Sequence, residues 1–158
     1  MNEAQPKTGR LPWPPLIYLA AIAIAVLLTA LYPLGWIGGL LADLLFVIGL
    51  LVLLAVVTLW FTALRTLAAA KTTFHPNGVP AHLVTSGPFS MSRNPIYLAN
   101  SLLLVGIGLV GGMVWFLLLA FVAGYAVSVL AIRREEAVLA TKFGKKYRDY
   151  EKRVRRWI

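Results

Sequence analysis

Two neighbouring carboxylates, Glu135 and Glu136, directly follow Arg133 and Arg134 in this chain of 158 residues. A carboxylate can accept hydrogen bonds from an amine or a ribose hydroxyl, and the forked guanidinium of arginine suits anionic groups such as carboxylates and phosphates. One interpretation is therefore a binding site in which Arg133, Arg134 and Glu135 face the polar segment 75–97. The other is the solvated end of a helix, and the residues alone leave both interpretations open.

A polar stretch, residues 81–97, lies between two long apolar blocks and carries a Ser-Gly-Pro turn. Two imidazoles, His75 and His82, lie in or near this stretch. It ends at Asn94 and Pro95, which suit a helix start because Asn can cap free amides and Pro at the first helical position loses no hydrogen bond. We expect this stretch to form the floor of a binding site where a membrane helix begins.

Neither the histidines nor the tyrosine of this segment defines a chemistry by itself. His75 and His82 stand seven positions apart in a chain without cysteine, so no metal site is predicted, and both are expected to donate to a bound ligand or to loop carbonyls. Tyr97 should place its hydroxyl near the membrane surface, where tyrosines are also common without any function. No nucleophile with its base, phosphate-binding loop or zinc-binding helix is recognisable.

The composition predicts that these residues belong to a membrane protein. Hydrophobic residues make up 59% of the chain and the mean hydropathy is +0.78. Asp43 is the only charged residue between positions 11 and 64, and positions 94–132 carry no charge. A helix crosses a bilayer with about 20 apolar residues, so each apolar block is long enough for two crossings. We therefore predict an all-α integral membrane protein with four transmembrane helices.

The expected helices form a single membrane domain over residues 1–158. The segment after position 94 must fold back, because 39 residues in one helix would measure about 58 Å against a hydrocarbon core of about 30 Å. Gly108 and Gly112 stand at this break, either as a hairpin turn or as a small-xxx-small contact between helices. The domain is divided into a lead-in at 1–15, a four-helix core at 16–134 with helices at 16–32, 42–70, 95–110 and 113–134, and an amphipathic basic tail at 135–158.

The distribution of charge predicts the orientation in the membrane. The net charge is +9, and with four crossings every Lys and Arg lies on one side. The positive-inside rule then places both termini and the loop 71–94 in the cytoplasm. The basic tail is expected to contact anionic membrane lipids. Nucleic acid is not an expected partner, since no nucleic-acid-binding module fits the sequence.

The tail also shows the periodicity of one amphipathic helix. Its apolar residues recur at spacings of 4, 4, 3, 4 and 3, with Lys and Arg on the other face. Gly144 interrupts the pattern and is expected to loosen or bend the helix. This helix can rest on lipid, form a wall of the site, or do both. The apolar face is Leu139, Phe143, Tyr147, Tyr150, Val154 and Trp157.

Four short motifs together resemble a known enzyme family. They are Leu-Val-Thr-Ser-Gly-Pro-Phe at 83–89, Ser-Arg-Asn-Pro-Ile-Tyr at 92–97, Arg-Arg-Glu-Glu at 133–136 and Lys-Phe-Gly-Lys-Lys-Tyr-Arg-Asp-Tyr at 142–150. In this order, with one helical hairpin between them, they resemble the isoprenylcysteine carboxyl methyltransferase family. The wider group includes the phospholipid methyltransferases and many short prokaryotic relatives. The resemblance covers residues 71–155.

The resemblance implies a membrane methyltransferase that uses S-adenosylmethionine at the cytoplasmic face and methylates a lipophilic acceptor. A prokaryotic cytoplasmic membrane is the expected location. Arg133, Arg134 and Glu135 form the expected catalytic group, in which one arginine corresponds to the substrate-binding arginine of the family. The resemblance implies cofactor contacts from nine residues, to which His75 is added as a donor to a bound ligand. The nine are His82, Leu83, Val84, Phe89, Asn94, Pro95, Ile96, Tyr97 and Glu135.

Asn94 departs from the family pattern, which has histidine at this position. Asn can donate a hydrogen bond but is no acid or base near neutral pH. Methyl transfer needs mainly alignment and a desolvated path, so the departure bears on the acceptor more than on activity. The acceptor is therefore expected to be an isoprenylcysteine-like, phospholipid-like or other small hydrophobic molecule. The alternatives are a non-enzymatic membrane scaffold and an inactive family member. Transport is disfavoured because the helices carry few polar residues at mid-membrane depth.

Overall fold

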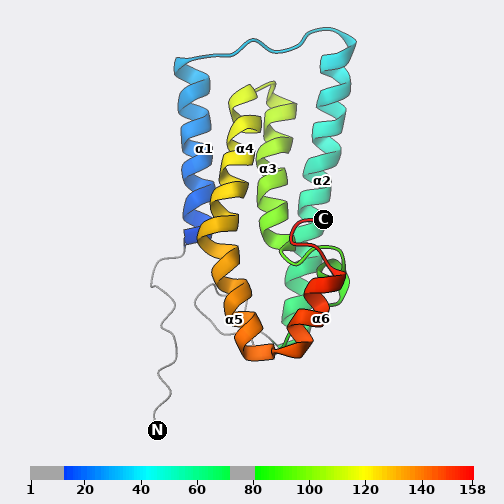
Figure 1. Ribbon diagram of the computed structural model, residues 1–158. Coiled ribbons are helices and arrows are strands. Elements are labelled where there is room, and N and C mark those ends of the chain that lie inside the picture. The colour runs from blue at the N-terminus through cyan, green and yellow to red at the C-terminus, as the bar shows by residue number, and fades with distance from the viewer. Residues whose placement is uncertain (1–12, 72–80) are drawn as a thin grey trace.

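Helices make up the framework of the chain in the computed structural model, which describes residues 13–71 and 81–158 (Figure 1). The described residues contain no strand, which confirms the predicted all-α class. The elements in chain order are α1 (Trp13–Leu31), α2 (Leu40–Ala69), a 3-10 turn η1 (Gly87–Ser90), α3 (Pro95–Gly111), α4 (Val114–Val127), a π turn η2 (Ser128–Ile132), α5 (Arg133–Phe143) and α6 (Lys145–Arg153).

Three helical runs in the described residues are long and apolar enough to cross a membrane. They are Pro14–Leu31, Leu40–Ala69 and Val114–Phe143. The fourth apolar helix, α3, has 17 residues and a length of about 25 Å at 1.5 Å per residue, which is slightly less than a hydrocarbon core. Large apolar side chains are exposed along α1, α2 and α4, as expected of surfaces that face lipid. The crossing of the membrane by all four helices and the side on which the termini lie stay predictions.

The four long helices lie side by side in the order α1, α4, α3, α2 (Figure 1). Alanines let α1 and α4 approach closely, because Ala21 and Ala25 of α1 share a buried cluster with Ala120 and Ala123 of α4. Helices α1 and α4 run in opposite directions, as do α2 and α3. One end of the assembly therefore brings together the start of α1, the end of α2, the start of α3 and α5. Every site residue considered below lies at or near this end.

Glycines allow close contact between α2 and α3. A Cβ atom on Gly49 of α2 would lie 2.9 Å from the Cβ of Leu109 and 3.0 Å from the backbone nitrogen of Val110, both on α3. A Cβ atom on Gly106 would lie 2.6 Å from the Leu53 side chain of α2. These distances are shorter than van der Waals contact, so a side chain at Gly49 would push against the α3 backbone, and one at Gly106 would require the Leu53 side chain to move.

In the hairpin between α3 and α4, one glycine forms the expected turn and another forms the expected close contact between helices. Gly112 has a φ of 64°, in the left-handed region, and its N–H donates to the Gly108 carbonyl to end α3. Gly108 itself is buried, and a Cβ there would lie 2.8 Å from the Leu117 side chain of α4. One glycine thus makes the turn, and the other lets the hairpin helices pack.

The end of the fourth helix differs from the prediction. Instead of stopping at 134, the helical run passes from α4 through η2 into α5 and ends at Phe143. The π turn carries an extra residue, which rotates the following residues by about 100° around the helix relative to a regular one. This rotation sets the directions of the two glutamates that begin α5.

The tail forms two helices rather than one, and the break falls at Gly144, where a bend was expected. Gly144, with a φ of 52° and a ψ of −119°, separates α5 from α6, and α6 ends at Arg153. Most of the predicted apolar face still forms one cluster, since Tyr147, Tyr150 and Val154 pack with Leu139 and Phe143. Trp157 packs instead against the cluster between α1 and α4. The periodicity identified the apolar residues correctly, but the bend at Gly144 folds the chain back on itself.

Replacement of Gly49 by Ala should lower the thermal unfolding temperature of the detergent-solubilised protein. The new methyl group meets α3 backbone that cannot move aside, and overpacking of this kind costs about 1–3 kcal/mol. Gly38→Ala is the matched control, because a Cβ there meets no atom within 4 Å. Equal unfolding temperatures for the two variants would contradict the close contact between α2 and α3.

Candidate active site

A tyrosine and a glutamate from two different motifs meet at the start of α3. The Tyr97 hydroxyl, in the first turn of α3, donates to Oε1 of Glu135, in the first turn of α5, at 2.5 Å. Tyr18 of α1 braces the tyrosine, since its hydroxyl donates to the Tyr97 carbonyl at 3.0 Å and lies 2.8 Å from Oγ of Ser101. Three helices therefore fix the position of this pair.

The Glu135 carboxylate is half-buried and only partly used by the protein. Oε1 accepts from Tyr97, while Oε2 makes no hydrogen bond with any residue that the structure describes. A carboxylate held from one side in this way can accept a hydrogen bond from an amine or a hydroxyl on the other. Such an arrangement suits a cationic or hydroxyl-rich ligand.

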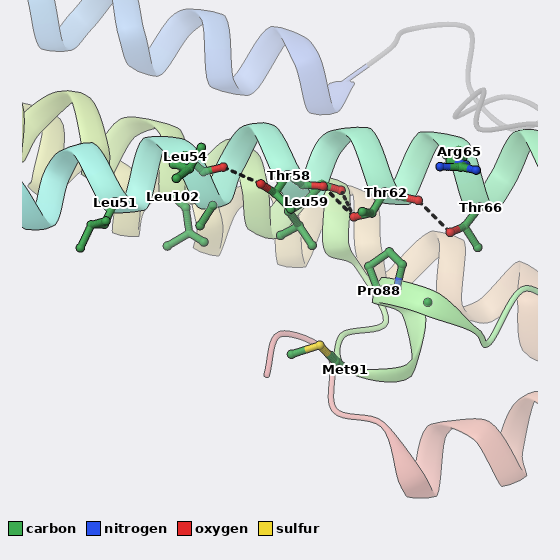
Figure 2. A pocket seen from close by; sticks show the side chains of 12 residues that line it. Leu51, Leu54, Thr58, Leu59, Thr62, Arg65, Thr66, Pro88, Met91 and Leu102 are labelled. Carbon is green, nitrogen blue, oxygen red and sulfur yellow. Dashed lines mark hydrogen bonds between the residues drawn. The ribbon is translucent and has the colours of Figure 1, made fainter.

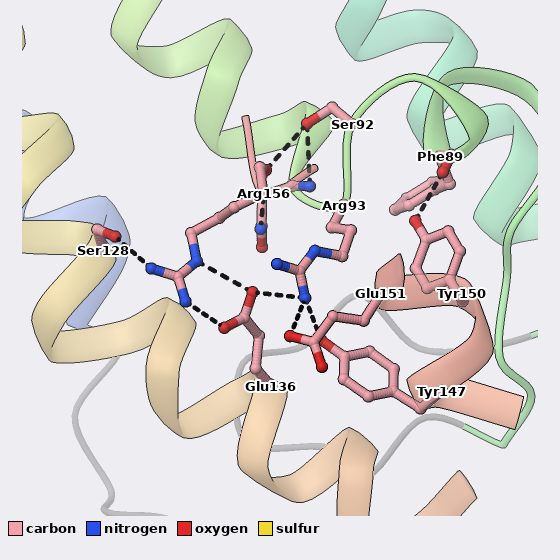
Figure 3. Close-up of polar contacts among 10 residues, drawn as sticks. Phe89, Ser92, Arg93, Ser128, Glu136, Tyr147, Tyr150, Glu151 and Arg156 are labelled. Atoms are coloured by element: carbon pink, nitrogen blue, oxygen red, sulfur yellow. Dashed lines mark hydrogen bonds and ion pairs between the residues drawn. The ribbon is translucent and has the colours of Figure 1, made fainter. Parts of the chain in front are cut away.

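The neighbouring glutamate, Glu136, binds two arginines from distant parts of the chain (Figure 3). Arg156, near the C-terminus, makes a bidentate pair with it, with Nε 3.1 Å from Oε1 and Nη2 2.6 Å from Oε2. Arg93, from the polar segment, places Nη1 3.2 Å from Oε1. The Glu136 side chain is only 12% exposed, so water screens these ion pairs less than it would at the surface.

Arg93 lies at the centre of the network that Figure 3 shows. Its Nη1 also contacts Oε1 of Glu151 at 2.6 Å and the Tyr147 hydroxyl at 3.2 Å, both on α6. Burial by itself would lower the pKa of Arg93, but the bond to Glu151 and the charge of Glu136 outweigh it and raise the pKa above its usual value. The guanidinium is therefore a permanent cation that holds α5 and α6 to the start of α3.

The last five residues, 154–158, form a strap that returns to the start of α3. The Arg93 N–H donates to the Arg155 carbonyl at 3.0 Å. The Arg156 carbonyl accepts from Oγ of Ser92 at 3.3 Å and from Nδ2 of Asn94 at 3.2 Å. Arg156 also reaches Oγ of Ser128, in the π turn, at 3.2 Å. The strap thus connects the polar segment to the π turn η2 that follows α4.

The turn η1 is attached to α6 by a further bond. The Tyr150 hydroxyl donates to the Phe89 carbonyl at 2.6 Å, and burial raises the pKa of this tyrosine to about 12. It therefore keeps its proton at every physiological pH. Tyr147 packs edge-on against Tyr150, with ring centroids 6.2 Å apart, and Leu83 lies against the same cluster.

Several predicted site residues converge at this end, and others do not. Asn94 directly precedes α3, as expected, but the predicted cap is wrong, because its side chain makes no cap hydrogen bond and binds the strap instead. Arg133 and Arg134 are exposed and make no hydrogen bond or ion pair with another described residue. His82 is exposed, and His75 lies outside the described residues. The remaining predicted cofactor residues are half-buried or buried around the polar segment, and they are Leu83, Val84, Phe89, Pro95 and Ile96.

The sequence did not predict that Arg93, Glu136 and Arg156 form one network of ion pairs. One signal was present, because Arg93 is the only charged residue of the segment 81–97 and a lone cation between apolar blocks needs a carboxylate partner. Arg93 meets Glu136 because the α3–α4 hairpin brings α5 back to the start of α3, and it meets Glu151 because the chain returns after Gly144. No local pattern predicts this return.

The protein is therefore a helical integral membrane protein. At one end of its helices, Tyr97 holds the Glu135 carboxylate in place. A model of the phospholipid methyltransferase family matches residues 44–146, well over half of the chain, and the chain therefore belongs to this family. The match confirms the resemblance drawn from the motifs and makes the protein a membrane methyltransferase in kind. It extends into α2 and takes in both Tyr97 and Glu135, but it excludes most of α6 and the strap. No curated protein and no solved structure matches the chain.

Replacement of Glu136 by Gln should release the strap. Gln keeps the shape of the side chain but removes the negative charge between Arg93 and Arg156. Removing one partner of a buried ion pair lowers the free energy of unfolding by about 3 kcal/mol. Faster hydrogen exchange at residues 154–158 and a lower unfolding temperature are expected. Glu151→Gln is the control, because the Glu151 side chain is 44% exposed and such pairs contribute about 1 kcal/mol or less. Unchanged exchange in the Glu136 variant would contradict the anchoring role.

Proposed function

We propose that this protein transfers a methyl group from S-adenosylmethionine to a lipophilic acceptor at the membrane surface. The observation that carries the proposal is the bond between Tyr97 and Glu135. It joins the Asn-Pro-Ile-Tyr motif to the Arg-Arg-Glu-Glu motif, which are the two segments that the resemblance assigns to cofactor binding. Family membership supports methyl transfer in general, and this geometry supports a cofactor at the start of α3.

The residues at the start of α3 fit the charge and the donors of this cofactor. Its amine and ribose hydroxyls are hydrogen-bond donors, and Oε2 of Glu135 is an acceptor with no partner among the described residues. The amine and the sulfonium are cationic, which also favours a carboxylate close by. Tyr97 and Glu135 would hold the polar end, with Leu83, Val84 and Phe89 of the polar segment as the apolar lining.

When bound, S-adenosylmethionine supplies an electrophilic methyl group, so that the acceptor–methyl bond forms as the methyl–sulfur bond breaks and its electron pair goes to sulfur. A reaction of this kind needs alignment of the reacting atoms and exclusion of water more than it needs proton transfer. The protein can supply both. Tyr18 and Tyr97 fix Glu135 in place, and the strap positions the segment that precedes α3. Asn94 contributes here by holding the strap, which is a task that needs no titratable group.

The acceptor is proposed to reach the site from the bilayer, with Arg133 or Arg134 near its anionic group. Both arginines are exposed beside Glu135 at the start of α5, so their guanidinium groups can meet a ligand from outside. The basic residues of α2, α5 and α6 lie at this same end, which the positive-inside rule places in the cytoplasm, where the cofactor is present. The acceptor class is an isoprenylcysteine-like, phospholipid-like or other small hydrophobic molecule.

Calorimetry of S-adenosylmethionine with the detergent-solubilised protein tests the proposal. Wild type should bind in the micromolar range, and Glu135→Ala should weaken binding at least tenfold, which corresponds to about 1.4 kcal/mol. Tyr97→Phe should weaken binding less, because it leaves the carboxylate in place. Asp149→Ala is the matched control, since it removes an exposed carboxylate of α6.

Transfer of a labelled methyl group into a membrane lipid extract then separates an enzyme from an inactive relative. Label in the organic phase, lost in Glu135→Ala, would support the proposal. No cofactor binding by folded wild type would contradict it and favour a scaffold. Binding without transfer to any lipid or hydrophobic acceptor would favour an inactive family member.

A further inference from the structure

An apolar groove of about 750 Å³ runs along α2, between this helix and the segment that holds η1 and Met91 (Figure 2). One wall is a stripe of α2 residues that recur every three or four positions and so lie on one face of the helix. The opposite wall comes from Leu102 of α3, from Pro88 of η1 and from Met91. Met91 is 74% exposed and flexible, so this wall can adapt to a ligand.

Along α2 the groove covers about one membrane leaflet and the adjoining head-group region. Its α2 wall extends from Leu51 to Thr66, a distance of about 22.5 Å at 1.5 Å per residue. One leaflet contributes about 15 Å of hydrocarbon. If Leu40 marks one boundary of the hydrocarbon, then Arg65 lies about 38 Å along the helix, about 8 Å beyond the other boundary and at the level of the lipid head groups.

The part of the groove along α2 suits an apolar ligand. Three threonines line it, but their hydroxyls already donate to α2 carbonyls, with Thr58 bonded to Leu54 at 2.9 Å and Thr66 bonded to Thr62 at 2.7 Å. Thr62 bonds to the Thr58 carbonyl at 2.7 Å. These hydroxyls present mainly methyl groups to a ligand, and the rest of the α2 wall is leucine and alanine apart from Arg65.

Arg65 is the charged residue of the lining and stands at the head-group end. Its side chain is exposed, and it forms no ion pair with any acidic residue in the described part of the chain. A guanidinium above an apolar groove complements a molecule with a phosphate above a hydrocarbon chain. A zwitterionic phospholipid also carries a phosphate, but its head-group cation offsets the charge, so an anionic phospholipid is attracted more strongly to Arg65.

We propose that this groove is a binding site for one anionic phospholipid, with an acyl chain along α2 and its phosphate on Arg65. The site is separate from the Tyr97 and Glu135 pair and does not depend on the proposed cofactor. It would hold an anionic lipid against η1, whose Phe89 is bonded to Tyr150 of α6. The occupant would therefore steady the polar segment from the membrane side.

Native mass spectrometry of the full chain with equal phosphatidylglycerol and phosphatidylcholine tests the site. Wild type should retain one phosphatidylglycerol with at least a tenfold preference over phosphatidylcholine. Arg65→Gln should remove most of the preference, and Arg65→Lys should keep part of it. Arg148→Gln, which removes an exposed arginine of α6, should leave the preference unchanged.

A second pair of variants tests the acyl-chain part of the groove. Leu54→Trp should fill the groove and lower retention of both lipids, whereas Val57→Trp adds the same ring to an exposed α2 position that does not line it. A preference that survives in Arg65→Gln, or that falls equally in Arg148→Gln, would overturn the proposal in favour of general surface charge. Equal retention in the two tryptophan variants would also overturn it. Cofactor binding by these variants is a separate measurement, which keeps failure of this site distinct from failure of the methyltransferase proposal.

Discussion

The polar end of this molecule depends on one half-buried carboxylate held between two arginines. Glu136 neutralises Arg93 and Arg156, and each of these connects it to another part of the chain. Arg93 joins it to the start of α3 and to α6, while Arg156 joins it to the strap and to the π turn. Removing the charge would leave two guanidinium groups close together in a poorly solvated region, which is why the arrangement relies on Glu136 more than on its exposed partner Glu151.

The two adjacent glutamates have different partners. Neighbours on a helix point about 100° apart, so Glu135 and Glu136 cannot serve the same partner. Glu136 is saturated by arginine and stabilises the structure. Among the residues that the structure describes, Glu135 accepts a bond only from Tyr97 and only on Oε1, so its other oxygen can accept from a ligand. The π turn before α5 sets both directions, in keeping with the frequent occurrence of π turns at functional sites.

The membrane explains features that would be unfavourable in water. Large apolar side chains cover the outside of α1, α2 and α4, and the closest helix contacts rely on glycine and alanine rather than on burial of large side chains. In a bilayer, packing of small residues replaces the hydrophobic effect as the force between helices. The groove beside Arg65 extends the same principle to lipid, since an apolar chain can fill a hollow that side chains leave open.

The sequence by itself determined the helical class, the positions of the first three apolar helices to within a few residues, and the family. These follow from composition and from local spacing, which need no knowledge of distant contacts. A bend at Gly144 was expected, but only the tertiary structure decided that the chain turns back there and that the strap returns to Asn94. It also decided that Arg93 and Arg156 surround Glu136. These features depend on ion pairs between residues 20 to more than 40 positions apart, and no local pattern encodes which distant charges will meet when the chain turns back.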